Sequence, residues 1–563
     1  MMERRWAGPA GGTSFGALAA LCVWSVALGA CSGDIDPRDP NGGGPHLPQG
    51  GSGAGSGPGA GSGPGPAVGA PGDPRIAKRI WRLSPSQFNA EVQRVLGAGA
   101  PAVSIPESAA EDGLTNIAAN AVVDLGNASI FADGARSIAS WAVAQRGTVS
   151  RCTDHGTDAC RDSFLVWFPQ AAFRRPVPQA EVDELRTLFN DLRSAYDWDY
   201  AYGGLVRAVL LSPDFLYRTE LGAGSGALLT PNEIANLLAF AITDQSPDDA
   251  LLQAAASGDL TDPAQREAQA RRLMQKSERS WQRFFWEWLQ LSTLYSQGEE
   301  VGLSPALVAQ MEEEYRAFVR EIVVNEGGNL RDVLSAPYTW AGPELAAHYG
   351  AQHPGGGVAR VQLDPAQRGG LLTQGAWLVS HGKRGRDNVV RRGMNIYKQA
   401  MCNDISPPAG VDVQAELAKL VGPDASVREV VDARGAAPSC GGCHRVPDPV
   451  GMVFESFAST GGWQATYPNG QAVDTRVDVS GLGSFDNARA FSSALAGDLS
   501  FQRCFVQRLT QFMVGIDLGS PQMVLWTQQA HERFLQSDTS LEELVVAIVR
   551  HPAFIERRME GAP

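Results

Sequence analysis

The sequence predicts a mainly α-helical protein, in which several consecutive helical modules follow a disordered tether rich in glycine and proline. Three observations predict this fold class. Apolar residues recur at helical spacing through most of the chain, whereas clear alternating strands are scarce. Capping residues followed by proline, which are typical of helix starts, open several of these segments. A tract of 43 residues near the N-terminus contains 15 Gly and 9 Pro and has too few apolar side chains to form a core.

The first 30 residues have the layout of a secretory signal. Arg4 and Arg5 precede an apolar run over residues 18–30 that is too short to span a bilayer comfortably. The run ends in Leu-Gly-Ala before Cys31, which is typical of a lipobox whose cysteine is diacylated and becomes the mature N-terminus. The alternative is an ordinary signal cut near Ala30, which would leave the protein exported but soluble. We expect an exported protein of the cell envelope, lipid-anchored to a membrane in the periplasm or at the outer-membrane face.

The rest of the chain is expected to divide into a linker and several modules. Residues 31–74 are interpreted as the lipid-anchor site and a flexible linker. Residues 75–563 are too many for a single core. The predicted order is an N-terminal helical module, a helical module with a disulfide loop, a third helical module, a connecting helical module and a C-terminal module. Their predicted bounds, in the same order, are 75–150, 151–223, 224–360, 361–412 and 413–563.

Three capping boxes predict helix starts along these modules. In each, a Ser or Thr is followed three residues later by Gln or Glu, so that the two side chains cap each other's backbone N–H groups. The three boxes are Ser84 with Gln87, Thr230 with Glu233, and Ser426 with Glu429. The last box predicts a short helix just before the motif discussed below.

Two longer segments indicate how the helices pack and repeat. The aromatic block over residues 281–289 has helical spacing, and we expect it to form core rather than a ligand platform. Residues 205–218 align without gaps with residues 544–557. This similarity indicates that two modules end in the same helix, proline turn and helix.

The charge of the chain restricts its partners. The formal net charge is −14, and an acidic protein is repelled by the phosphates of nucleic acids, so we exclude a nucleic-acid partner. Beyond the signal, no stretch reaches the roughly 18 uninterrupted apolar residues of a transmembrane helix. We therefore expect the lipid alone to connect the protein to the membrane. The sequence predicts no oligomeric state.

The cysteines sort into functional groups. Cys22 lies in the signal, Cys31 is the lipidation site, and two others belong to the motif discussed next. Four are left over, and in an oxidising compartment they suggest two disulfides. These four are Cys152, Cys160, Cys402 and Cys504. The first two close a short polar loop and are the favoured pair, which leaves Cys402 with Cys504 by elimination, although three pairings are possible in principle.

The segment Cys440-Gly-Gly-Cys443-His444 predicts a haem site and makes residues 413–563 a C-terminal cytochrome-c-like module. Two cysteines spaced in this way can form thioethers with both vinyl groups of one haem c, while the histidine that follows supplies the proximal iron ligand. Half of a zinc site and a thioredoxin-like dithiol are alternative interpretations. A segment without any cofactor is a third alternative.

The second axial ligand of such a haem is less clearly indicated. Met513 lies on a predicted helix after Cys504 and is the favoured candidate. Met452 and His381 are the alternatives, and Met452 follows His444 so closely that it is a poor candidate to reach over the ring. A methionine in a helix commonly fills core gaps instead.

Several further motifs occur in a fixed order. They are RLSxxQFN at 82–89, AFRRP at 172–176, LLSPDF at 210–215, AHYG at 347–350, RGGLLTQ at 368–374, RRG at 391–393, DPVG at 448–451 and FESF at 454–457. With the Cys440–His444 motif, this order resembles a family of exported multidomain bacterial proteins from planctomycetes and myxobacteria. The family consists of consecutive domains of unknown function, and the resemblance covers the chain from residue 80 onward.

The resemblance implies a C-terminal haem-c-like module but no established reaction. Many members of the family have methionine just before the Asp-Pro pair, where this chain has Pro447. A distal haem ligand therefore cannot be transferred from the family to this chain.

Taken together, these patterns predict an exported, lipid-anchored c-type haem protein that transfers single electrons to or from a redox partner protein. One alternative is a haem-dependent oxidoreductase acting on peroxide or a small organic substrate. The other is a surface-anchored binding or scaffold protein in which the haem is structural or absent. Whether the protein is an enzyme is left open by the sequence.

Overall fold

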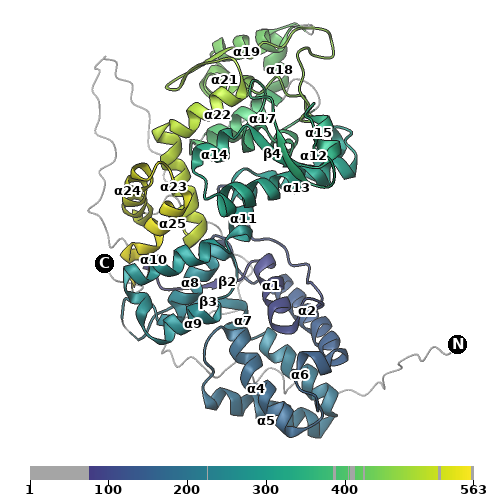
Figure 1. Cartoon of the computed structure of the whole chain (residues 1–563), viewed down its shortest axis with the longest axis vertical. Coiled ribbons are helices and arrows are strands. Elements are labelled where there is room, and N and C mark those ends of the chain that lie inside the picture. Colours follow the sequence, from purple (N-terminus) through teal and green to yellow (C-terminus); the bar gives the residue numbers. More distant parts are fainter. Residues whose placement is uncertain are drawn as a thin grey trace, which may run out of the picture. The chain divides into compact units, whose positions relative to one another are not determined.

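The computed structural model shows a mainly helical chain (Figure 1), as the sequence predicts. The described residues are 75–558, except 225, 384–387, 404, 406–412, 423–424 and 518–520. Among them, no helix combines the length and the apolar character needed to cross a bilayer. The signal over residues 1–30, the lipidation site Cys31 and the linker over residues 31–74 lie outside the described residues and stay predictions.

Helices of the N-terminal part surround a first hydrophobic core. The first of them, α1 (Pro85–Leu96), begins at the predicted box, because Ser84 and Gln87 cap each other's backbone N–H groups. Phe88 on this helix contacts Phe131 and Phe215 at ring-centroid distances of 5.3 and 5.5 Å. The other helices of this core are α2 (Leu125–Ala144), α3 (Arg146–Val149), α4 (Asp158–Phe173), α5 (Gln179–Ala195), α6 (Trp198–Leu210) and α7 (Pro213–Leu216).

A second and larger core begins at α8 (Pro231–Thr243), which is capped by the predicted Thr230 and Glu233 box. Its aromatic centre is α11 (Glu278–Trp288), where Phe284 lies 5.8 Å from Phe505 and 5.4 Å from Phe512 of α23 (Leu499–Val514), measured between ring centroids. The prediction that the aromatic block forms core is therefore confirmed.

The other helices of the chain after α8 are short to medium in length. They are α9 (Asp249–Ala256), α10 (Pro263–Met274), α12 (Leu294–Glu300), α13 (Pro305–Val319), α14 (Leu330–Ser335), α15 (Pro343–His348), α16 (Gly375–Ser380), α17 (Asn388–Asn395), α18 (Val413–Leu420), α19 (Val427–Ala436), α20 (Gly441–His444), α21 (Pro447–Met452), α22 (Ala488–Gly497), α24 (Pro521–Gln536) and α25 (Leu541–Arg550). Short 3₁₀ turns occur at η1 (Ala118–Asn120), η2 (Asp259–Thr261), η3 (Leu291–Thr293), η5 (Leu371–Thr373) and η7 (Pro552–Phe554), and π-helical segments occur at η4 (Arg320–Asn325) and η6 (Ile396–Ala400).

The strands of the described part are short and form two-stranded pairs, which agrees with the predicted scarcity of strands. Three pairs are antiparallel: β2 (Arg79–Arg82) with β3 (Tyr217–Glu220), β4 (Tyr338–Ala341) with β5 (Ala359–Gln362), and β6 (Val477–Val479) with β7 (Gly483–Phe485). The fourth pair is parallel and joins β1 (Ile76–Ala77) to β8 (Arg557–Arg558).

Ion pairs around the buried Glu220 connect β8, the last strand of the parallel pair, to the antiparallel pair of β2 and β3. Glu220 accepts hydrogen bonds from Arg79 at 2.9 Å and from Arg557 at 2.7 Å. Burial alone would raise the pKa of Glu220, but the two guanidinium groups outweigh burial and lower this pKa to about 2. Arg79 of β2 and Arg557 of the last described strand, β8, are thus fastened to the same carboxylate of β3.

The internal sequence similarity corresponds to a structural repeat. Residues 205–218 include the end of α6, all of α7 and the start of β3. Residues 544–557 include the end of α25, all of η7 and the start of β8. Both segments therefore run from a helix through a proline-initiated turn, as predicted, and then continue into a strand.

Both predicted disulfides are present. Cys152, in the loop before α4, is bonded to Cys160 in the first turn of that helix, with 5.9 Å between their Cα atoms. Cys402 and Cys504, with 5.5 Å between their Cα atoms, connect the segment before the Cys-x-x-Cys-His motif to α23. Disulfides persist in oxidising compartments, so the two bridges are consistent with an extracytoplasmic protein.

Candidate functional site

The Cys-x-x-Cys-His motif follows directly after α19. This helix begins at the predicted box, where the Ser426 hydroxyl accepts the backbone N–H of Glu429 at 3.2 Å. After a short turn the chain continues as α20, which packs on α19. The turn is tight, because a Cβ atom at Gly441 would lie 2.4 Å from the carbonyl oxygen of Gly435. Glycine at position 441 therefore allows the motif to fold back against α19.

Cys440 and Cys443 are the free cysteines of the described part of the chain, and both are partly buried. The backbone N–H of Cys443 donates to the carbonyl oxygen of Cys440 at 3.1 Å, so a single helical turn separates the two residues. Thioether formation with the two vinyl groups of a haem requires two such free thiols.

His444 is held by a buried carboxylate. Its Nδ1 lies 3.0 Å from Oδ1 of Asp448, whose side chain is only 1% exposed. The other carboxylate oxygen, Oδ2, accepts the Nε–H of Arg434 at 2.6 Å. A carboxylate accepts hydrogen bonds, so the proton belongs on Nδ1 and the lone pair of Nε2 is available to a metal.

Asp448 is positioned by a close crossing of two helices. It lies in the first turn of α21, which packs on α17. A Cβ atom at Gly451 would lie 1.8 Å from the carbonyl oxygen of Val389, and one at Gly393 would lie 2.0 Å from that of Pro447. The two backbones can approach this closely only because each helix has glycine at the crossing.

A buried arginine extends this support beyond α21. Arg392 on α17 is fully buried and donates through Nη1 to the carbonyl oxygens of Phe454 and Phe457, at 3.0 and 2.8 Å. Its Nη2 donates to Leu378 and Ala458, at 3.2 and 3.0 Å. Arg392 therefore fixes the chain that leaves α21, and the RRG and FESF motifs of the sequence have a structural role here.

The residues present fit a covalently attached haem. Two free thiols precede a histidine whose Nδ1 is bound to a buried carboxylate, and metal-ligating histidines typically have such a partner on the second ring nitrogen. Among the described residues, no group of three His, Cys, Asp or Glu side chains is placed to hold a metal ion by itself. A haem, whose porphyrin supplies four nitrogens, needs only the axial ligands from the protein.

Met513 lies away from this motif, in an apolar part of the second core. It lines a small cavity together with Met274, Trp281, Phe284 and Leu509, and its side chain is 2% exposed. None of the residues described around this cavity belongs to the Cys440–His444 segment. These surroundings are those of a core methionine, and the ligand role of Met513 stays a prediction without geometric support.

The two alternative distal ligands are also tied into the core. Met452 ends α21 and is fully buried. His381 Nε2 lies 2.8 Å from the carbonyl oxygen of Leu289, and burial lowers the pKa of His381 to about 4. If Nε2 donates to this carbonyl, only Nδ1 of His381 keeps a lone pair. The structure therefore brings Cys440, Cys443 and His444 together, and among the described residues it gives no geometric support to Met513, Met452 or His381 as the distal ligand.

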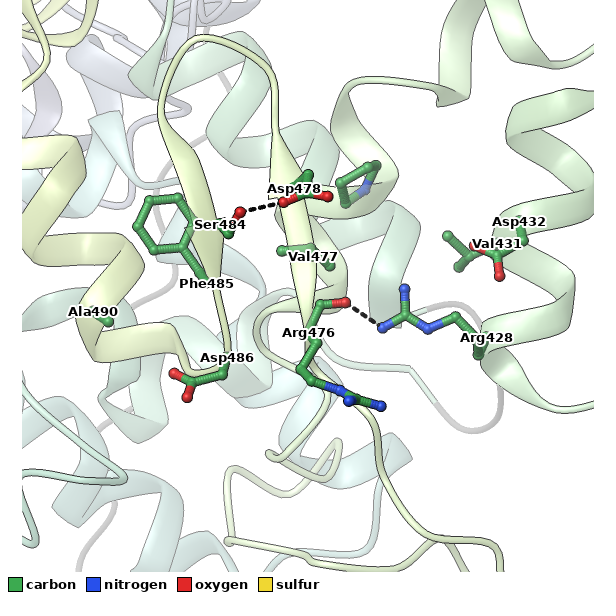
Figure 2. A pocket seen from close by; sticks show the side chains of 11 residues that line it. Arg428, Val431, Asp432, Arg476, Val477, Asp478, Ser484, Phe485, Asp486 and Ala490 are labelled. Carbon is green, nitrogen blue, oxygen red and sulfur yellow. Dashed lines mark hydrogen bonds between the residues drawn. The ribbon is translucent and has the colours of Figure 1, made fainter.

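A groove of about 680 Å³ lies between α19, the helix that precedes the motif, and the β6–β7 hairpin (Figure 2). Arg428 and Val431 of α19 line it on one side, and Val477 and Phe485 of the hairpin line it on the other. Pro449, the neighbour of Asp448, also lines the groove. Arg428 Nη2 donates to the carbonyl oxygens of Asp474 and Arg476, at 3.0 and 2.6 Å, and so ties α19 to the hairpin.

Comparison with known proteins agrees with this picture of helical modules that end in a cytochrome-like module. Three family models match consecutive parts of the chain, and together they cover half of it. The models are PSD5, a protein of unknown function (DUF1595), at 160–220; PSD4, a protein of unknown function (DUF1592), at 229–351; and PSCyt3, a protein of unknown function (DUF1588), at 368–467. The chain belongs to the planctomycete-type family of consecutive PSD and PSCyt domains, as its motifs predict.

The PSCyt3 match contains the Cys440–His444 motif and Asp448, and its name indicates a cytochrome-like module. The match spans residue 412, where we predicted a boundary between the connecting module and the C-terminal module; the predicted bounds stay predictions. No curated protein and no solved structure matches the chain.

The sequence analysis includes Asp448 in the DPVG motif but gives it no role, and it misses Arg434. The helical i, i+4 spacing between His444 and Asp448 is a second sequence signal for the contact of these two residues. Arg434 reaches Asp448 only because α19 packs on α21, and this packing is not encoded in any local pattern.

Proposed function

We propose that the chain is an exported, lipid-anchored c-type haem protein that carries single electrons. The fixed orientation of His444 is the observation that supports this proposal most. Its Nδ1–H is bound to the buried Asp448, so its Nε2 is free to ligate iron next to the free thiols of Cys440 and Cys443. A bound haem would supply an iron that takes up and releases one electron.

The two cysteines and the histidine of the motif each have a role in haem binding in this proposal. Cys440 and Cys443 would hold the porphyrin through thioethers, and His444 would be the proximal ligand. The glycine crossing of α17 and α21 and the Cys402–Cys504 disulfide would keep this segment rigid. A rigid site keeps ligand geometry the same in both oxidation states, which lowers the reorganisation that accompanies each electron transfer.

The N-terminal part would place the haem module at a membrane. A diacylated Cys31 would anchor the chain, and the linker over residues 31–74 would give the modules a reach of roughly 35 to 40 Å toward a redox partner protein. The two disulfides support export, because such bridges form in oxidising compartments.

Haem staining of the exported protein in a denaturing gel tests the attachment. We expect wild-type protein to carry a covalent stain and a c-type absorption spectrum, and we expect Cys440→Ala with Cys443→Ala to lose the covalent stain. Ser439→Ala, next to the motif, is the matched control and should keep the stain. A colourless wild-type protein that is properly exported and disulfide-bonded would contradict the proposal and favour a scaffold without haem.

The groove between α19 and the β6–β7 hairpin favours a second candidate function, a haem-dependent oxidoreductase acting on a small organic molecule or a peroxide. Its volume of about 680 Å³ is of the size of small-molecule pockets. Its lining combines the apolar side chains of Val431 and Phe485 with the charged side chains of Arg428, Asp478 and Asp486. A substrate in the groove would lie close to the helix that precedes the motif.

Carbon monoxide binding separates this candidate from the simple electron carrier. An oxidoreductase needs an open coordination position, so its reduced form is expected to bind carbon monoxide readily and to shift its absorption spectrum. A reduced protein with covalent haem that leaves carbon monoxide unbound would contradict the oxidoreductase and leave electron transfer as the function.

A further inference from the structure

The second ring nitrogen of His444 is part of a buried chain of charges. His444 contacts Oδ1 of Asp448, and Arg434 contacts Oδ2 of the same carboxylate. Asp448 is 1% exposed and Arg434 is 7% exposed, so water does not compete for either oxygen. The guanidinium of Arg434 on α19 therefore places a full positive charge next to the carboxylate of Asp448.

The two charges act on the imidazole in opposite directions. A carboxylate that accepts the Nδ1–H makes the imidazole a stronger electron donor through Nε2, which stabilises the more positive, ferric iron. A guanidinium on the same carboxylate withdraws part of that negative charge and weakens the effect. The balance between Asp448 and Arg434 therefore decides how strongly His444 donates to iron.

We propose that Asp448 and Arg434 are positioning residues that set the reduction potential of the haem bound at His444. This inference rests on the proposed haem site and adds the groups that tune it. Asp448 lowers the potential, and Arg434 raises it again. The electron itself comes from, or goes to, a redox partner protein, and neither residue gains or loses a proton in the process.

A purely structural role for the pair is the alternative. The Arg434–Asp448 ion pair connects α19 to α21, and its loss could loosen the module without any specific effect on the iron. Loosening would act in the same direction in every variant that breaks the pair. Tuning predicts opposite directions, because one variant removes a negative charge and the other removes a positive charge.

The experiment is a spectroscopic redox titration of the complete exported protein and its variants. In Asp448→Asn we expect reduction to become more favourable by about tenfold in the equilibrium constant, which corresponds to a rise of about 59 mV for a one-electron couple. In Arg434→Gln we expect a fall of similar size. Asp432→Asn on the exposed side of α19 and Arg445→Gln after the motif are the controls, and both should shift the potential much less.

The outcomes separate this inference from the proposed function. Wild-type protein without covalent haem would end both. Covalent haem with unchanged potentials in the two variants, or with shifts in the same direction, would overturn the tuning role alone.

A measurement on the wild-type protein tests the hydrogen bond between His444 and Asp448 and does not depend on the folding of any variant. Nuclear magnetic resonance of the ¹⁵N-labelled, diamagnetic ferrous protein should show a His444 Nδ1 proton that exchanges slowly with water, since Asp448 is buried. A deprotonated or rapidly exchanging Nδ1 would contradict the hydrogen bond on which the inference depends.

Discussion

Two buried carboxylates of this chain have opposite surroundings. Asp448 accepts hydrogen bonds from the guanidinium of Arg434 and from the imidazole of His444, and the guanidinium compensates its charge. Glu314 on α13 is also buried, and its oxygens accept hydrogen bonds from the hydroxyls of Thr339 and Tyr349, at 2.9 and 2.6 Å, with no guanidinium bonded to the carboxylate among the hydrogen bonds described. Burial raises the pKa of Glu314 to about 7, against the opposing effect of these hydrogen bonds.

This raised pKa predicts a pH-dependent stability. The folded protein keeps the Glu314 proton between about pH 4.5 and pH 7 while the unfolded chain releases it, so the free energy of unfolding falls as pH rises through this window. The slope is about 1.4 kcal/mol per pH unit at most. In Glu314→Gln this contribution is removed, and the stability of the variant relative to wild type should rise between pH 4.5 and pH 7 and stay constant above it.

Chemical denaturation at several pH values measures this difference. Glu313→Gln, which changes an exposed neighbour on the same helix, is the control and should show no comparable trend. A difference between Glu314→Gln and wild type that is the same at all pH values would show that folding does not raise the pKa of Glu314.

At the scale of elements, the crossing of α17 and α21 links the Cys440–His444 motif to its surroundings. The helices meet backbone to backbone at Gly393 and Gly451. Because α21 contributes Asp448, any shift of this helix changes the hydrogen bond to His444.

We therefore expect Gly451→Ala to reduce both stability and haem loading. Its Cβ atom would lie 1.8 Å from the carbonyl oxygen of Val389, and a backbone atom cannot move aside as a flexible side chain can. The expected loss is about 1 to 3 kcal/mol in the free energy of unfolding. Thermal unfolding and the ratio of covalent haem to protein measure the two effects.

Gly497→Ala at the end of α22 is the matched control, since nothing lies within 4 Å of its Cβ position. It should unfold at the wild-type temperature or slightly above. If Gly451→Ala behaves like this control, the two helices are not packed as closely as the structure has them.

Local chemistry explains which elements could be predicted from the sequence. The capping boxes at Ser84, Thr230 and Ser426 mark helix starts because a cap depends on residues three positions apart. The disulfides followed from the compartment and from elimination. Contacts between distant segments had no such signal, which is why the glycine crossing and the Arg434–Asp448 pair were found only in the structure.

The lack of a local signal for long-range contacts also limits how much of the site can be predicted from the sequence. Cys440, Cys443 and His444 are adjacent in sequence, so the motif alone brings them together. A distal ligand must come from elsewhere in the chain, and Met513 was selected by its position in sequence, which says nothing about its neighbours. In the structure it packs against Trp281 and Phe284 instead.

At the scale of the whole molecule, several long-range connections tie the segments that precede the Cys440–His444 motif to the C-terminal helices. The parallel pair of β1 and β8 joins the first and last described strands, and Arg79 and Arg557 share Glu220. The Cys402–Cys504 disulfide fastens the chain before the motif to α23. The segments that precede the motif are therefore connected to the C-terminal helices by packing and a disulfide and not only by the chain.

Mass spectrometry of the mature, exported wild-type protein tests the haem assignment most directly. After proteolysis, the peptide that contains Cys440, Cys443 and His444 should carry the added mass of one haem, bound through both cysteines, and should show a c-type absorption spectrum. The same peptide with two unmodified thiols, or with a disulfide between them, in a protein that is otherwise mature would contradict the assignment.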